Sequence, residues 1–336
     1  MASEKRFLVA LPVRNGGEFL KKCVYSILGQ TYDLFRLIVL DNASTDGSAT
    51  WLRDLRDSRI EIYESSSVLS IEENWGRIRH LENSDEYLTI VGHDDLFDAQ
   101  FLKSMSHLID RFPDANLYHS KFRLIDSRGR TIRRALSAPI VEKGHEFLAA
   151  RLGFRRDSFG TGYVVKMNAF VKAGGIPQYK KLLFADDALW LTLMAGSYKA
   201  TLQEESFSYR VHSGSTSYAP DWRSLFEALY CYLGLLSLRA TEDPQLREVL
   251  ASGLEGYLKF WLRWAYFSEP RFRRDKQEFE RAILKLAGTA RPLLDSAARE
   301  QFTALARHAI FPRLSMVRWN MWRARKWISL WYASHL

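Results

Sequence analysis

Short apolar segments alternate with amphipathic segments along the first hundred residues of this chain. Phe7–Val13 is an apolar run that ends in a polar turn, which is typical of a buried strand. Residues 17–28 carry apolar side chains at helical spacing, which predicts an amphipathic helix. Short strands separated by helices indicate βαβ units, and therefore an α/β fold with a mostly parallel sheet. The remaining predicted elements are strands at 37–40, 60–63 and 87–91, and helices at 45–55, capped by Ser44, and at 71–81.

The pattern changes in the second half of the chain. A mixed region holds a strand near 117–125, a helix at 145–152 and a Gly-rich stretch from 159 to 179. From Trp222 onward the spacing is almost entirely helical, with breaks near 241–244 and 268–270. We therefore predict two domains, an α/β domain over 1–217 and a helical domain over 218–336.

The charge of the chain is concentrated at its C-terminal end. Of 336 residues, 47% are hydrophobic, which suits a globular core, and the net charge is +9. Residues 301–336 contain six Lys or Arg, no acid, and four of the ten tryptophans. The segment at about 311–336 has the composition of an amphipathic helix that lies on an anionic membrane surface. The alternatives are a helix docked on the α/β domain and a contact in a homodimer. Because the basic excess is confined to this tail and no reader motif occurs, we expect no nucleic-acid partner.

Cysteine content and apolar run lengths indicate where the protein resides. Cys23 and Cys231 lie in apolar, helix-like surroundings, so we predict small core residues in a reducing compartment. Phe7–Val13 is short and is followed by Arg14, which does not fit a signal peptide. The longest apolar run, Ala228–Leu238, has 11 residues, whereas a spanning helix needs about 20. We expect a cytoplasmic protein, peripheral at the inner face of the cytoplasmic membrane.

Three sites place aspartates where a buried strand is predicted to end: Asp41, Asp94-Asp95 and Asp186-Asp187. In open α/β sheets, ligands bind outside the carboxyl ends of the strands. A single Asp there is often a turn former or a helix N-cap. Two adjacent carboxylates raise each other's pKa, so both ionise readily only beside a cation. Since Mg²⁺ binds a few carboxylates together with substrate phosphates and water, the paired aspartates indicate a metal and phosphate site.

The known phosphate-binding loops are missing from the sequence. No G-x-x-x-x-G-K-[ST] loop occurs, and Asn15-Gly16-Gly17 follows the first strand where a G-x-G-x-x-G would bind a dinucleotide. A nucleotide held through a metal fits the sequence better than one held in a Gly-rich loop.

Five segments, in this order, resemble those of the family 2 glycosyltransferases. The resemblance covers about residues 6–217, and the order of five individually weak motifs makes it specific. It implies the GT-A fold, a Rossmann-like mixed and mostly parallel sheet flanked by helices, here followed by a C-terminal helical region. The segments are Pro12-Val13-Arg14-Asn15, Val39-Leu40-Asp41-Asn42-Ala43-Ser44-Thr45-Asp46-Gly47-Ser48, Gly92-His93-Asp94-Asp95 in the place of the D-x-D region, Phe184-Ala185-Asp186-Asp187-Ala188-Leu189-Trp190, and Tyr209-Arg210-Val211-His212 with residues 213–217.

The resemblance implies a nucleotide-sugar donor held at the ends of the first two strands. Asp41 would bind the uracil or ribose end of the nucleotide. Pro12, Val13 and Asn15 would shape the base pocket beside it. Asn42 stands where the family commonly has a second Asp, and this departure weakens the assignment of a role to that position.

The same resemblance implies a divalent metal, Mg²⁺ or Mn²⁺, beside the donor diphosphate. Asp95 would be the chief metal ligand and His212 would complete the site, while Asp94 would lie by the donor ribose. The D-x-D region departs from the usual pattern, because Gly92 replaces its first Asp and His93 replaces a small residue.

Asp187 is implied as the general base. In an inverting displacement it would take the proton from an acceptor hydroxyl while that oxygen attacks the anomeric carbon. The metal would stabilise the departing diphosphate. Asp186 is the rival, because neighbouring residues at a helix start point in different directions and only one can face the acceptor. The usual order in the family, Glu then Asp, favours Asp187.

Four further residues are candidates for the site, each with a structural alternative. Gly160 and Thr161 belong to a stretch that lies either beside the donor sugar or acceptor, or in a plain turn. Trp190 either stacks on a sugar face or packs in the core. Arg210 acts either at the site or as a structural ion-pair partner.

Together these features predict an inverting glycosyltransferase of polysaccharide biosynthesis. It would move a sugar from a nucleotide-diphosphate donor, UDP-linked by family habit, to a hydroxyl of a glycan or lipid-linked glycan. One alternative is a sugar-1-phosphate nucleotidyltransferase, whose usual Gly-rich first loop with Arg and Lys is missing here. The other is a nucleotide- or glycan-binding module on an inactive transferase fold, against which Asp41, Asp95, Asp187 and His212 argue.

Overall fold

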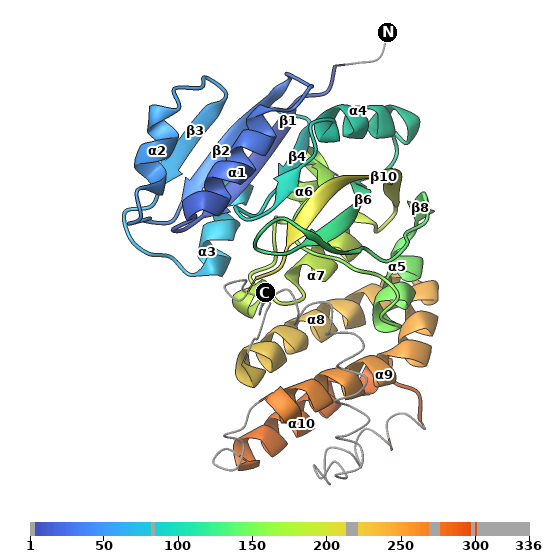
Figure 1. Cartoon of the computed structure of the whole chain (residues 1–336). Helices are drawn as coiled ribbons and strands as arrows, with labels where there is room; N and C mark the ends of the chain where they lie inside the picture. Colours follow the sequence, from blue (N-terminus) through green and yellow to red (C-terminus); the bar gives the residue numbers. More distant parts are fainter. Residues whose placement is uncertain (1–3, 82–84, 213–220, 269–275, 297–299, 301–336) are drawn as a thin grey trace. The chain divides into compact units, whose positions relative to one another are not determined.

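The computed structural model describes residues 4–81, 85–212, 221–268, 276–296 and 300, which divide into two compact units (Figure 1). Unit 1 comprises residues 1–144, 158–178 and 185–212, and unit 2 comprises residues 145–157, 179–184 and 213–336. The functional division into domains 1–217 and 218–336 stays a prediction.

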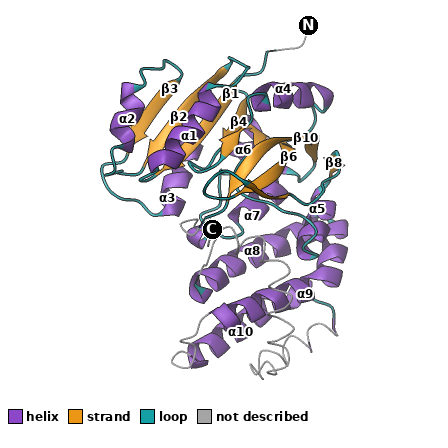
Figure 2. Cartoon of the chain, in the orientation of Figure 1, coloured by secondary structure: helices purple, strands orange, loops and turns teal. Residues whose placement is uncertain are grey.

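Unit 1 is built on a single mixed sheet (Figure 2). Among the described residues the sheet has ten strands, in the order β3-β2-β1-β4-β9-β6-β10-β5, with β7 beside β6 and β8 beside β10. The elements in chain order are β1 (Phe7–Val13), α1 (Gly17–Leu28), β2 (Phe35–Asp41), α2 (Ser48–Asp54), β3 (Ile60–Glu64), α3 (Ile71–Gly76), η1 (Arg77–His80), β4 (Tyr87–Ile90), β5 (Leu96–Phe97), α4 (Phe101–Arg111), β6 (Leu117–Ile125), β7 (Thr131–Arg134), β8 (Val141–Glu142), α5 (Gly144–Leu152), β9 (Val164–Lys166), α6 (Met167–Lys172), η2 (Lys180–Leu182), α7 (Ala185–Leu193), β10 (Lys199–Arg210), α8 (Trp222–Glu242), α9 (Pro244–Ser268), α10 (Lys276–Ala290) and η3 (Arg291–Leu293).

The longest strand pairings are parallel, which confirms the predicted fold class. β1 pairs in parallel with β2 from Phe7↔Phe35 to Val13↔Asp41, and with β4 on its other edge. β6 and β10 form a further parallel pair, and the short β9 joins the two halves by antiparallel pairing with β4 and β6. Because β1, β2 and β4 run in the same direction, their carboxyl ends lie together at one edge of the sheet.

Buried apolar side chains on both faces hold this sheet in place. Every residue of β1 is buried, as expected for a central strand covered on both faces. Helix α1 turns Leu20, Cys23, Val24 and Ile27 inward, the stripe expected from its spacing. Each such side chain contributes about 1.5–3 kcal/mol when it leaves water, so the strand ends are rigidly supported.

Two predicted helices differ from the structure near the sheet edge. Helix α2 begins at Ser48, three residues later than predicted, and Gly47 with a φ of 86° precedes it, so Ser44 is not its cap. Helix α3 ends at Gly76 and continues only as the 3-10 turn η1. The polar residues between β2 and α2 instead form a loop that contacts the loop after β1.

The acidic pair Asp186-Asp187 does not end a strand, contrary to the prediction. It lies in the first turn of helix α7 and follows the 3-10 turn η2. The apolar residues that follow the pair form the rest of helix α7. The prediction failed because a short apolar run in a sequence does not distinguish a strand from a buried helix.

Unit 2 is helical, as the spacing after Trp222 predicts. Asp221 caps α8 by accepting a hydrogen bond from the Ser224 backbone, and the predicted break separates α8 from α9 at Asp243. Cys231 is exposed, so its predicted core position was wrong, whereas Cys23 is buried. No helix in the described ranges is long and apolar enough to span a membrane. The amphipathic tail predicted at 311–336 lies outside the described residues.

Candidate active site

The loops that follow β1 and β2 are joined by hydrogen bonds. The Asn15 backbone donates to Ser44 Oγ at 2.9 Å, and the Thr45 backbone donates to Asn15 Oδ1 at 2.8 Å. The Gly17 backbone donates to Asp46 Oδ2 at 3.0 Å. Asn15 has a φ of 52°, a left-handed conformation that Asn tolerates better than most residues. Asn15 therefore connects the loop after β1 to the loop after β2.

Asp41 ends β2 with one carboxylate oxygen unused. Its Oδ2 accepts from the Ser44 backbone at 3.0 Å, but its buried Oδ1 has no hydrogen-bond partner within the described part of the chain. The side chain is 1% exposed. A buried acceptor without a donor is unfavourable by about 1–3 kcal/mol. This oxygen is therefore suited to receive a donor group from a ligand.

Two residues that the sequence analysis missed lie beside Asp41. Arg77 donates from Nη1 to the Asp41 carbonyl at 3.1 Å and to Asn74 Oδ1 at 3.0 Å. Asn74 donates from Nδ2 to the Leu40 carbonyl at 3.2 Å. Both residues lie in a segment predicted only as a helix, and it is the fold that brings this segment to the end of β2.

The turn Gly92–Asp95 follows β4 and carries a fully buried carboxylate. Asp95 is 0% exposed, and it accepts from the Arg210 backbone at 2.9 Å through Oδ1 and from Thr161 Oγ1 at 2.7 Å through Oδ2. Burial and the charge of Asp94 raise the pKa of Asp95 well above its ordinary value. Asp95, the predicted chief metal ligand, thus connects the β4 turn to β10 and to the Gly-rich stretch.

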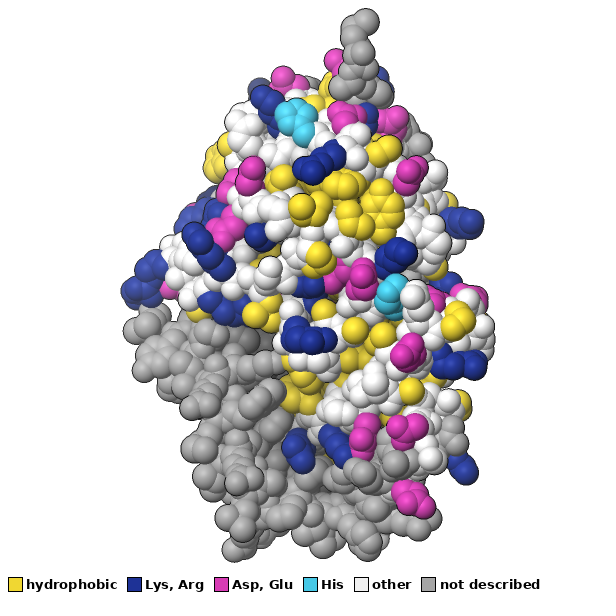
Figure 3. All heavy atoms as spheres, turned by 90° about the vertical axis from the view of Figure 1, so that its right-hand side faces the viewer, with side chains coloured by type: hydrophobic (Ala, Val, Ile, Leu, Met, Phe, Trp, Pro, Cys, Tyr) yellow, Lys and Arg dark blue, Asp and Glu magenta, His cyan; other side chains and the backbone are white. Residues whose placement is uncertain are grey.

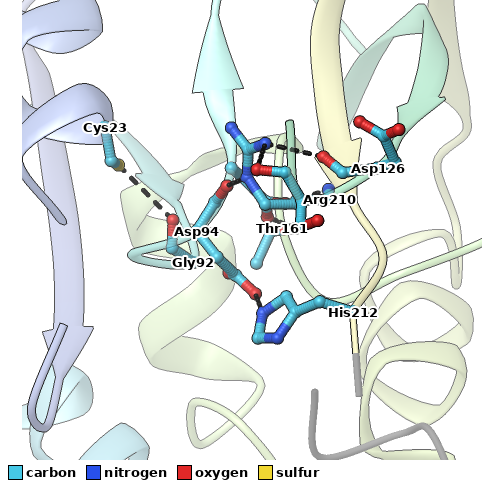
Figure 4. A network of polar contacts seen from close by, with 9 residues as sticks. Cys23, Gly92, Asp94, Asp126, Thr161, Arg210 and His212 are labelled. Atoms are coloured by element: carbon cyan, nitrogen blue, oxygen red, sulfur yellow. Dashed lines mark hydrogen bonds and ion pairs between the residues drawn. The ribbon is translucent and has the colours of Figure 1, made fainter. Parts of the chain in front are cut away.

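Asp94 and His212 form the accessible pair of this turn (Figure 4). His212 Nε2 lies 2.8 Å from Asp94 Oδ2, and the side chains are 20% and 19% exposed, respectively. Burial opposes ionisation of Asp94, but the hydrogen bond from His212 and the charges of His93 and His212 lower the pKa of Asp94 overall. An ionised carboxylate beside an imidazole is thereby presented at the surface of the turn.

Arg210 holds the acidic turn in place from behind (Figure 4). It is 1% exposed and donates from Nε to the Asp94 carbonyl at 2.7 Å and from Nη1 to the Asp126 carbonyl at 2.8 Å. Its guanidinium also lies 4.8 Å from the centre of the Phe19 ring. These polar contacts are hydrogen bonds to backbone carbonyls, not the ion pair that was one of its two predicted roles.

His93 lies in the same turn with its side chain half-buried. Burial lowers the pKa of His93, against the opposing charge of Asp94. A Cβ on Gly16 would lie 3.2 Å from its Cδ2 atom and 2.6 Å from Leu20 Cβ. Gly16 is therefore required where the loop after β1 passes this histidine.

The acidic pair of α7 lies on the other side of the Gly-rich stretch. Asp187 is 0% exposed, whereas Asp186 is partly exposed. A Cβ on Gly160 would lie 3.9 Å from Asp186 Cβ and 3.5 Å from Cζ3 of Trp75. Trp190 is 2% exposed and stacks on Tyr163 at 4.4 Å, so it belongs to the core. Trp75 and Asp186 thus both lie beside Gly160.

The described residues hold no group of three or more His, Cys, Asp or Glu side chains arranged to bind a metal by themselves. The pair Asp94 and His212 can supply two protein ligands. Mg²⁺ often relies on one or two carboxylates plus substrate phosphates and water. Any ion at this turn would therefore depend on a bound phosphate group.

Comparison with known proteins shows that the chain is similar to glycosyltransferases. A family model described as Glycosyl transferase family 2 matches residues 8–172. The glycosyltransferase GlyG of Streptococcus pneumoniae serotype 4 is 30% identical over 105 residues, which cover 29% of this chain and 33% of GlyG. The chain spans between 15% and 38% of the length of the curated relatives that it matches.

Two solved structures share the fold at low sequence identity. S. aureus TarS 1–349 in complex with UDP-GlcNAc matches with a TM-score of 0.72 and 14% identity, over 90% of this chain and 87% of that chain. The mannosyltransferase PcManGT from Pyrobaculum calidifontis, in complex with GDP-Man and Mn²⁺, matches with a TM-score of 0.50 and 14% identity, over 90% and 84%. The first match agrees with the GT-A fold that the motifs imply.

Proposed function

Because residues 8–172 belong to glycosyl transferase family 2, we propose that this chain moves a sugar from a nucleotide-diphosphate donor to a hydroxyl of a glycan or lipid-linked glycan acceptor. The observation that carries the proposal is the edge where β1, β2 and β4 end. There the unpaired Asp41 oxygen lies at the end of β2, and Asp94, paired with His212, follows β4; both strands pair in parallel with β1. In α/β sheets this edge is where ligands bind.

The nucleotide would bind at the end of β2. The unpaired Oδ1 of Asp41 would accept a hydrogen bond from an N–H of the base or a ribose hydroxyl. Pro12 and Val13 are buried in β1 next to it, and Asn15 fixes the adjoining loop. A UDP-linked donor is proposed, and the complex of the TarS fold relative with UDP-GlcNAc supports it.

The donor diphosphate would bind at the β4 turn. The Asp94 carboxylate is a ligand that suits Mn²⁺ or Mg²⁺, and the His212 imidazole, 2.8 Å from it, would be the second protein ligand. They would hold the ion, and Asp95 would position them from the interior. When bound, a divalent ion supplies positive charge that stabilises the departing diphosphate.

We propose Asp187 as the base that deprotonates the acceptor, with inversion at the anomeric carbon. Because Asp187 is buried, its carboxylate must become accessible when the acceptor binds. Asp186, partly exposed and adjacent, is the matched alternative.

The test measures donor binding and turnover separately. UDP-sugars are screened with Mn²⁺ for thermal stabilisation and for hydrolysis or transfer, in the wild type, Asp187→Asn and Asp186→Asn. Asp187→Asn should lower kcat by about 10²–10⁴-fold with donor affinity kept, as loss of a general base does. Asp186→Asn should keep kcat within about threefold. A large loss in Asp186→Asn alone would move the base to Asp186.

The same screen separates the alternative functions. Binding of donors without turnover for any of them would favour a binding module. Release of pyrophosphate from a nucleotide triphosphate and a sugar phosphate would identify a nucleotidyltransferase.

We also propose that the protein binds no nucleic acid and that it attaches to the inner face of the cytoplasmic membrane. Basic and acidic side chains are interspersed on the face in Figure 3, unlike the continuous basic stripe that nucleic acid requires. Peripheral attachment at the cytoplasmic membrane face, through residues 311–336, is tested by liposome flotation of the full chain. The same chain truncated at Gln301 is compared, and equal flotation of the two would refute it.

A further inference from the structure

Trp75 differs from the other tryptophans that the structure describes. Trp51 contacts Tyr25, and Trp190 stacks on Tyr163, while the remaining three lie in aromatic clusters of unit 2. Within the described ranges Trp75 has no ring contact, and its indole is partly exposed. An indole at the surface without an aromatic neighbour leaves apolar area that a ligand can cover.

The fold fixes Trp75 between the parts of the proposed active site. On one side of it, Asn74 and Arg77 attach helix α3 and the turn after it to the carbonyls of Leu40 and Asp41, where the nucleotide is proposed to bind. On its other side is Gly160, where an added Cβ would lie 3.5 Å from Trp75 Cζ3 and 3.9 Å from Asp186 Cβ.

Gly160 is also adjacent to the diphosphate end of the site. The next residue, Thr161, donates to Asp95 at 2.7 Å, and Asp95 belongs to the turn that carries Asp94. The indole edge therefore lies near three parts of the proposed site. These are the end of β2, where the nucleotide is proposed to bind, the turn Gly92–Asp95, and the acidic pair of α7. In a glycosyl transfer, the group between the diphosphate and the base is the sugar that is transferred.

We propose that Trp75 is the platform on which the transferred sugar of the donor stacks, and that Gly160 keeps the space beside the indole open. This assignment rests on the proposed glycosyl transfer. The face of an indole carries negative charge density, which attracts the polarised C–H groups on the apolar side of a pyranose ring. A side chain at position 160 would occupy the gap between the indole and Asp186, where the sugar edge would enter.

The experiment compares the affinity of UDP with that of UDP-glucose, UDP-galactose and UDP-GlcNAc by calorimetry with Mn²⁺. In the wild type at least one of the UDP-sugars should bind more tightly than UDP, and the ratio of the two affinities is the sugar advantage. In Trp75→Ala this advantage should fall by roughly fivefold to tenfold, as loss of an aromatic contact predicts, while the affinity for UDP stays within about twofold. Trp75→Phe keeps a ring and should retain most of the advantage.

Two further variants separate stacking from a loss of structure. Gly160→Ala introduces only ordinary van der Waals contacts, so it should fold and lose the sugar advantage with UDP binding unchanged. Trp51→Ala, a partly exposed tryptophan on α2, is the control and should change neither affinity.

Each result bears on one hypothesis. An unchanged sugar advantage in Trp75→Ala overturns the platform, and so does an equal weakening of UDP and all UDP-sugars. The platform is also overturned if the wild type binds none of the UDP-sugars more tightly than UDP. Failure of the wild type to bind UDP and every UDP-sugar would instead contradict the proposed function.

Discussion

The role of Arg210 can be tested by replacing it with methionine, which keeps the length of the side chain and removes its charge. In the structure this guanidinium is buried, and it donates to the carbonyls of Asp94 and Asp126 at 2.7 and 2.8 Å. The alternative is that Arg210 binds the donor diphosphate directly. The two roles predict opposite effects on stability and on ligand affinity.

The expected loss of stability follows from the two hydrogen bonds. A hydrogen bond to a charged group contributes about 1.5–3 kcal/mol, so two contribute about 3–6 kcal/mol before the favourable release of a buried charge is subtracted. Arg210→Met should therefore lower the free energy of unfolding by about 4 kcal/mol. For a domain of 150–250 residues this corresponds to a fall in Tm of roughly 8–16 °C.

Urea unfolding followed by circular dichroism measures the effect, with Arg128→Met as the control. Arg128 is exposed in the turn that Arg210 contacts, so its variant should stay within about 0.5 kcal/mol of the wild type. The affinity of folded Arg210→Met for UDP is measured in parallel. A stability equal to that of the wild type, together with lost UDP binding, would refute the structural role.

Two more predictions concern the residues around Asp95 and Gly160. Because the pKa of Asp95 is raised, its contribution to stability is complete below about pH 4 and is lost as the pH rises through the raised value. Thr161→Val removes a donor to the ionised form, so it should lower the free energy of unfolding by about 1–3 kcal/mol, more at a pH above the raised pKa of Asp95 than at a pH below it. Thr161→Ser is the control, and an equal loss at both pH values in urea titrations would contradict the reasoning. Gly162→Ala should destabilise by at least about 2 kcal/mol, because Gly162 has a φ of 76° and its Cβ would lie 2.6 Å from the Phe207 ring. The free energy of unfolding of Gly160→Ala should stay within about 1 kcal/mol of the wild type. Thermal melts compare the two variants, and equal melting temperatures would argue against the close contact of Gly162 with Phe207.

Local patterns were sufficient for the central strands and the first helix. Phe7–Val13 and Gly17–Leu28 have the predicted bounds, because a buried strand and an amphipathic helix each leave a direct imprint on apolar spacing. The predicted start of α2 was wrong, because the residues before Ser48 form a loop that contacts the loop after β1. The predicted strand end at Asp186-Asp187 was wrong, because a short apolar run does not distinguish a strand from a buried helix.

The sequence by itself predicted most residues of the candidate site, and only the tertiary structure added Asn74, Trp75 and Arg77 and showed which carboxylates are buried. Adjacent residues such as Asp94 and Asp95 look alike in sequence, but the backbone points one carboxylate to His212 and the other into the interior. The guanidinium of Arg210 is buried behind the same turn. Trp75 reaches Gly160 only because β2 and β4 flank β1 in the sheet and bring distant loops to one edge. Such pairings depend on three-dimensional packing, which leaves no regular spacing in the sequence.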